Sequence, residues 1–62
     1  MNHAEIIKNA MDEFEMLQRY MAVAKEENAI KTYEEMKGRY LVLKALLNSL
    51  SVDLSDIDKI KE

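Results

Sequence analysis

The sequence predicts an all-α protein: an antiparallel helical hairpin of about residues 3–27 and 30–50, followed by a short C-terminal helix of about residues 55–61. The first observation behind this prediction is the composition, because the 62 residues include one glycine and no proline and are rich in helix-forming residues. The second is the spacing of apolar residues along two long stretches. The third is that these stretches match each other when the chain folds back.

The first predicted helix begins near the N-terminus. Asn2 followed by Glu5 resembles a capping box with asparagine as the N-cap, and Met1 and Ile6 stand at the positions of a hydrophobic staple. Apolar residues then recur at alternating steps of three and four, which places them on one stripe of a helix. They are Ile7, Ala10, Phe14, Leu17, Met21 and Ala24.

The second stretch has the same spacing, and the two stretches fit either one long rod with a stutter or a hairpin that turns within residues 27–31. If the chain folds back between Asn28 and Ala29, every stripe residue meets an apolar partner, with small Ala10 and Ala24 facing large residues. Asn28 also tolerates the left-handed backbone of a helix end. The hairpin is therefore favoured. The second stripe consists of Tyr33, Met36, Tyr40, Leu43, Leu47 and Leu50.

The segment after the second stripe has a different character. Ser51 and Asp53 compete with the helical backbone for hydrogen bonds, so the second helix is expected to stop near Ser49 or Leu50. Ser55 then stands at an N-cap position. The spacing of the apolar residues that accompany it, Leu54, Ile57 and Ile60, predicts one face of a short helix.

Size and composition restrict what the chain can be. A chain of 62 residues is a single domain, residues 1–62, and a fold of this length buries only about 60% of its unfolded surface. Cysteine is absent, so disulfides are excluded, and oligomerisation is the expected source of extra stability. No apolar run approaches the length of a membrane span, and the N-terminus does not resemble a signal peptide. We expect a cytoplasmic location.

Some apolar residues fall outside the two stripes and form a candidate interaction surface. They are either scattered surface residues, which are common, or contacts to the C-terminal segment and to a second copy. The second interpretation predicts a homodimer in which two hairpins form a four-helix bundle, acting as a non-enzymatic protein–protein interaction module such as an adaptor, inhibitor or regulatory subunit. The residues are Met16, Tyr20 and Val23 in the first helix, and Leu41, Val42 and Leu46 in the second.

A nucleic-acid regulator is the alternative function. Lys37, Arg39 and Lys44 give the second helix a basic patch that is suited to RNA or DNA phosphates, although the formal net charge of −3 argues against it. Catalytic chemistry has less support. His3 is the only histidine and has no partner for a metal site or a triad, and the acidic pairs fall mostly off the stripes. The sequence thus predicts no enzyme, no metal and no cofactor.

Overall fold

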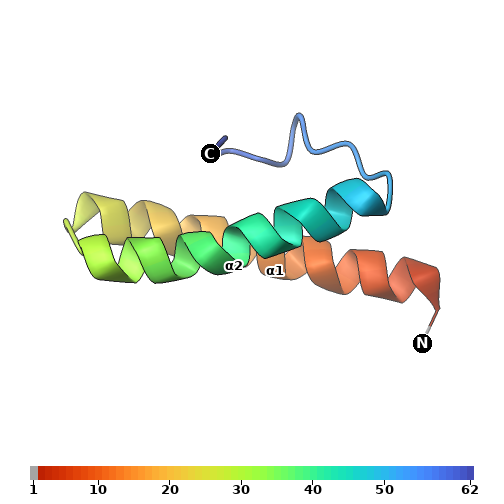
Figure 1. Cartoon of the computed structure of the whole chain (residues 1–62), viewed down its shortest axis with the longest axis horizontal. Helices are drawn as coiled ribbons and strands as arrows, with labels where there is room; N and C mark the ends of the chain where they lie inside the picture. Colours follow the sequence, from red (N-terminus) through yellow and green to blue (C-terminus); the bar gives the residue numbers. More distant parts are fainter. Residues whose placement is uncertain (1) are drawn as a thin grey trace.

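The structure is a computed structural model that describes residues 2–62. It contains two helices, α1 (His3–Glu26) and α2 (Ile30–Ser49), which pack against each other as a hairpin (Figure 1). Each helix ends one residue before its predicted C-terminal limit, and residues 2–62 contain no strand. The predicted hairpin is therefore confirmed, and the alternative of one continuous rod is wrong.

Helix α1 begins where its capping residue predicts. The Asn2 side chain accepts a hydrogen bond from the Glu5 backbone N–H at 2.8 Å, which satisfies one of the free donors at the helix start. The predicted staple includes Met1, which lies outside the described residues.

A turn of the Schellman type joins the two helices. The Ala29 N–H donates to the Ala24 carbonyl at 2.8 Å, and the Asn28 N–H donates to the Lys25 carbonyl at 3.1 Å. Asn28 has a φ of 59°, in the left-handed region that asparagine tolerates better than most residues. The turn thus falls within the predicted residues 27–31.

Helix α2 ends in a turn of the same type, but with a residue less suited to it. The Val52 N–H donates to the Leu47 carbonyl and the Ser51 N–H donates to the Asn48 carbonyl, both at 3.0 Å. Ser51 takes a φ of 64° without the freedom of glycine. A left-handed conformation at an ordinary residue costs about 1–2 kcal/mol, so this turn carries local strain.

The core lies along the seam between the helices, as the two stripes predict. At its centre the rings of Phe14 and Tyr40 stack with their centroids 5.2 Å apart and an interplanar angle of 10°. Stacked aromatic pairs add about 0.5–1.5 kcal/mol to the gain from burial alone. The buried stripe residues are Ala10, Phe14, Met21, Ala24, Tyr40, Leu43 and Leu47.

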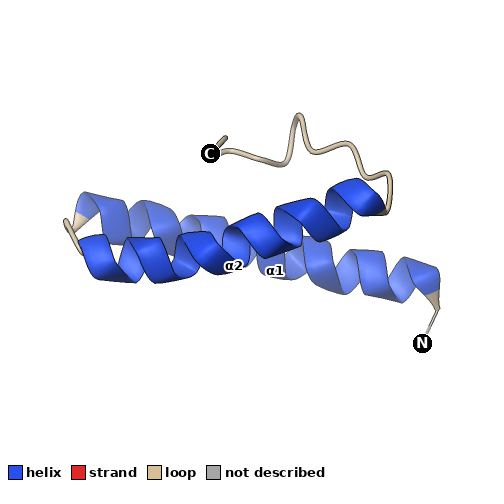
Figure 2. Ribbon diagram, in the orientation of Figure 1, coloured by secondary structure: helices blue, strands red, loops and turns tan. Residues whose placement is uncertain are grey.

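Residues 52–62, which we call the C-terminal arm, fold back along the hairpin as a loop (Figure 2). The predicted helix over residues 55–61 is wrong. The N–H groups of Ile57 and Asp58 donate to the Leu54 carbonyl at 3.1 and 2.8 Å, which closes one turn that goes no further. Three apolar residues spaced by three fit such a turn as well as a helix. Leu54 is buried, and Ile57 and Ile60 pack on the core from the arm.

Replacing Leu43 by aspartate is expected to abolish folding. Leu43 is 1% exposed, and an unpaired carboxylate in its place costs more than a chain of this size can lose. The matched control is Ile30→Asp, because Ile30 is 72% exposed and lies at the start of α2, outside both stripes. Circular dichroism at high dilution should show helicity lost in the first variant and kept in the second. Equal helicity in both variants would show that the seam is misplaced.

Ser51→Gly is expected to raise the free energy of unfolding by about 0.5–1 kcal/mol, the relief of left-handed strain less the greater chain entropy of glycine. Ser49→Gly serves as the matched control. Ser49 lies within α2 and its hydroxyl donates to the Leu46 carbonyl, so this substitution should destabilise. Urea unfolding of both variants measures the two effects. A lower free energy of unfolding for Ser51→Gly would contradict a strained left-handed conformation at Ser51.

Candidate functional site

The six predicted interaction residues are all exposed, with exposed fractions from 39% for Leu46 to 56% for Val42. On α1, Met16, Tyr20 and Val23 each follow a buried residue by two positions. Two positions rotate a side chain by about 200° around a helix, so these residues lie on the side of α1 away from the core. We call Met16, Tyr20 and Val23 the α1 outer face.

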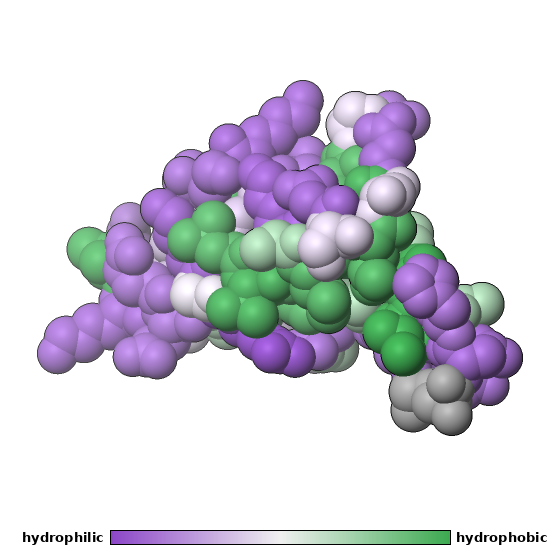
Figure 3. Space-filling model, turned by 45° about the vertical axis from the view of Figure 1, so that its right-hand side comes forward, coloured by the Kyte–Doolittle hydropathy of each residue, from purple (hydrophilic) through white to green (hydrophobic). Residues whose placement is uncertain are grey.

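The predicted residues of α2 lie on its own outer side. Val42 follows buried Tyr40 by two positions and Leu41 precedes buried Leu43 by two, whereas Leu46 is closer to the flank. We call Leu41, Val42 and Leu46 the α2 outer face. The structure thus places the six residues on two surfaces, one for each helix. Figure 3 shows an apolar patch across the middle of the visible face, bordered by hydrophilic residues.

Gly38 belongs to the same side of α2. It stands four residues before Val42, and a Cβ at its position would meet nothing within 4 Å. The glycine is therefore not required by packing within this chain. It also leaves a shallow place on the helix surface, beside the α2 outer face.

The predicted C-terminal cover for Leu46 is absent. Ile57 and Ile60 pack on the core of the hairpin, and Leu46 stays 39% exposed. The arm therefore closes the seam of the hairpin and leaves the α2 outer face open.

The three basic residues of the predicted nucleic-acid face each meet a carboxylate of the same chain. The Lys37 ammonium lies 3.4 Å from Glu62 and the Lys44 ammonium lies 2.9 Å from Asp58. Arg39 donates two hydrogen bonds to Glu13, at 2.7 and 2.9 Å. These hydrogen bonds hold the pKa of Glu13 below its usual value.

The basic residues also do not form one face. Lys37 and Lys44 are seven positions apart and both point to the arm, whereas Arg39 pairs with α1. Because each positive charge is balanced within the chain, the patch offers little net attraction to phosphates.

Two buried polar side chains hold the arm, and neither was predicted as a site residue. Gln18 is the first. It is 5% exposed, and among residues 2–62 the hydrogen bonds of its side chain all go to arm backbone. Its Nε2 donates to the Ile57 carbonyl at 3.1 Å. Its Oε1 accepts from the N–H groups of Lys59 and Ile60 at 2.6 and 3.1 Å. One amide side chain of α1 therefore fixes three backbone groups of the arm.

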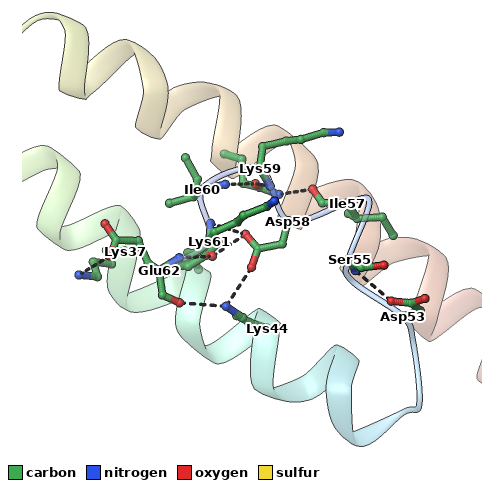
Figure 4. Close-up of polar contacts among 12 residues, drawn as sticks. Lys37, Lys44, Asp53, Ser55, Ile57, Asp58, Lys59, Ile60, Lys61 and Glu62 are labelled. Atoms are coloured by element: carbon green, nitrogen blue, oxygen red, sulfur yellow. Dashed lines mark hydrogen bonds and ion pairs between the residues drawn. The ribbon is translucent and has the colours of Figure 1, made fainter.

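Asp58 is the second buried polar residue, 6% exposed, and it reaches from the arm to α2 (Figure 4). Its carboxylate accepts hydrogen bonds from the Tyr40 hydroxyl at 2.6 Å and from the Lys61 N–H at 2.8 Å. The Lys44 ammonium lies 2.9 Å from the second oxygen. Burial alone raises the pKa of Asp58, but these hydrogen bonds and the lysine charge outweigh it, so the pKa is below the ordinary value of 3.8.

The end of the arm is bound by α2 as well. The Glu62 N–H donates to the Tyr40 hydroxyl at 3.1 Å, and the Lys44 ammonium donates to the Glu62 carbonyl at 2.9 Å (Figure 4). Burial and the hydrogen bond to Asp58 raise the pKa of Tyr40. The Tyr40 hydroxyl thus stays protonated, donating to one arm residue and accepting from another.

The fold also leaves a cleft of about 570 Å³ between α1 and the arm, with Ala22 and Arg19 on one side and Ile57 and Ile60 on the other. The arm therefore touches α1 without closing fully on it. No three His, Cys, Asp or Glu residues among residues 2–62 form a group that could hold a metal ion. His3 is exposed at the first position of α1.

Stability is expected to fall in acid through Asp58. Its folded-state pKa is depressed, so its contribution is fully present above about pH 4 and is lost as pH falls through the lower folded-state value. Thermal unfolding from pH 7 to pH 2.5 should show this loss. Asp58→Asn should flatten the acid limb of the profile, whereas Asp56→Asn, at an exposed position, should leave it unchanged. Identical profiles for both variants would remove Asp58 from this role.

In the part of the chain that the structure describes, neither helix is long and apolar enough to cross a membrane. The features that bear on function are therefore the two outer faces and the arm that Gln18 and Asp58 hold in place. Comparisons of this chain with protein families, with curated proteins and with solved structures give no match.

Proposed function

We propose that this protein is a non-enzymatic helical interaction module of the cytoplasm that works as a homo-oligomer and docks on another protein as an adaptor, inhibitor or regulatory subunit. The observation that carries this proposal is the exposure of large apolar side chains on two outer faces. None of them belongs to the buried core cluster of the hairpin. Exposed apolar side chains grouped in this way are typical of interaction sites.

The most economical partner is a second copy, with two hairpins joined as a four-helix bundle. Fully burying one large apolar side chain is worth about 1.5–3 kcal/mol, and three such residues on each copy supply much of the stability of so small a fold. The α2 outer face suits this contact because Gly38 beside it lets another helix approach closely. The α1 outer face is then left for a different protein.

Nucleic-acid binding receives less support from the residues proposed for it. Lys37, Arg39 and Lys44 are paired with carboxylates on two different sides of α2. Phosphate binding would have to break these pairs, and the formal net charge of −3 provides no general attraction to recover the loss.

Light scattering over a dilution series tests the proposal. The wild type is expected at twice the monomer mass of 7.2 kDa at high concentration. Val42→Asp should shift it to monomer if the α2 outer face forms the dimer, and Met16→Asp tests the α1 outer face in the same way. Ile30→Asp is the matched control, since Ile30 is 72% exposed and belongs to neither face. A stable helical monomer at every concentration would refute the homo-oligomer.

A further inference from the structure

The arm occupies a groove of the hairpin that recognises it in two ways. Gln18 binds backbone groups of residues 57–60, which a segment of any sequence can supply when it bends in the same way. Tyr40 and Lys44 bind the Asp58 carboxylate at 2.6 and 2.9 Å, which requires an acidic residue at one place. A second lysine, Lys37, faces the Glu62 carboxylate. The groove is thus a built site for an acidic segment with apolar residues between the acids.

The arm covers part of the apolar core. Leu54 is part of the core cluster together with Tyr40 and Leu47, which are fully buried beneath the surface that the arm helps to cover. Release of the arm would expose that apolar surface to water and replace the hydrogen bonds of Gln18 and Tyr40 to the arm by hydrogen bonds to solvent. The arm of a second copy would cover the same surface and reproduce every contact.

The connection to the arm favours such a replacement. Ser51 is strained in the left-handed region, and opening the chain there relieves the strain. The arm has no helix or strand of its own beyond one turn. On its α1 side it borders an open cleft of about 570 Å³, and among residues 2–62 the hydrogen bonds between the arm and α1 all come from Gln18. Short connections under strain are the usual site at which identical elements are exchanged between copies.

We infer that the C-terminal arm is exchanged between two copies, so that Asp58 and Glu62 of one chain pair with Lys44 and Lys37 of the other. This inference rests on the proposed homo-oligomer, because the exchange requires two copies that associate. Every contact of the arm is kept in the exchange. The difference is that each groove is completed by residues from the second copy.

Two charge-reversed variants of the full chain test the exchange. Lys44→Glu and Asp58→Lys each break the pair when they are alone. In a mixture, the first variant supplies an arm with Asp58 and the second supplies a groove with Lys44, and the reversed pair forms in the other groove. Mixing is therefore expected to raise the unfolding midpoint by about 4–8 °C, the effect of restoring one charged hydrogen-bonded pair in a domain of this size.

A second pair of variants controls for general effects of mixing. Glu13 and Arg39 form an ion pair within the hairpin, which the arm does not touch. Mixing Glu13→Arg with Arg39→Glu should therefore restore nothing. The double variant Lys44→Glu/Asp58→Lys shows how far a reversed pair can recover stability. Recovery by the double variant but none by the mixture would overturn the exchange.

The wild type provides a measurement that does not depend on folding of the variants. In a mixture of isotope-labelled and unlabelled protein, filtered NMR spectra should show contacts between Asp58 or Glu62 of one chain and Tyr40 of the other. A dimer without such contacts would refute the exchange and leave the proposed homo-oligomer intact. A wild-type chain that is monomeric at every concentration would refute both, whereas exchange that persists in Val42→Asp and Met16→Asp would refute only the outer-face dimer.

Discussion

Two packed helices cannot enclose their own seam. The seam between α1 and α2 is open along both of its long sides. The large seam residues Phe14 and Tyr40 are fully buried only because further groups cover them. The arm closes one of these sides, and no third helix is needed. Tyr40 joins the two parts, because its ring stacks in the seam while its hydroxyl binds the arm at Asp58 and Glu62.

The distribution of charge follows from the same constraint. An arm that lies over a seam brings its own polar groups to a partly buried place, where each must find a partner. Asp58 finds Tyr40 and Lys44, and residues 2–62 contain no buried side-chain polar atom without a hydrogen bond. Lys37 and Lys44, which the sequence suggests as phosphate-binding residues, are therefore paired with carboxylates of the arm.

The hairpin was predictable because the sequence features that specify it are local and periodic. The stripes, the Asn2 cap and the left-handed Asn28 each depend on residues within a few positions of each other. The path of the arm depends on contacts over about forty positions, and Gln18 binds backbone groups that have no sequence signature. Gln18 stands four residues after Phe14 and three before Met21, at the edge of the first stripe. This position was the signal in the sequence that could have identified Gln18 as a buried residue. The helix predicted for residues 55–61 failed because acids after Ser55 suggest a helix start, whereas Asp58 binds α2 instead.

The amide of Gln18 holds the arm through backbone groups alone. It presents one donor and one acceptor to a segment that turns at residues 55–57 and bends at residues 59–60, so that two successive N–H groups reach the same oxygen. A carboxylate in its place would lose the donor, and an ammonium would lose the acceptor. A helix, whose own backbone groups are all engaged, can therefore hold an irregular loop through a single glutamine, and these hydrogen bonds do not depend on the side chains of the loop.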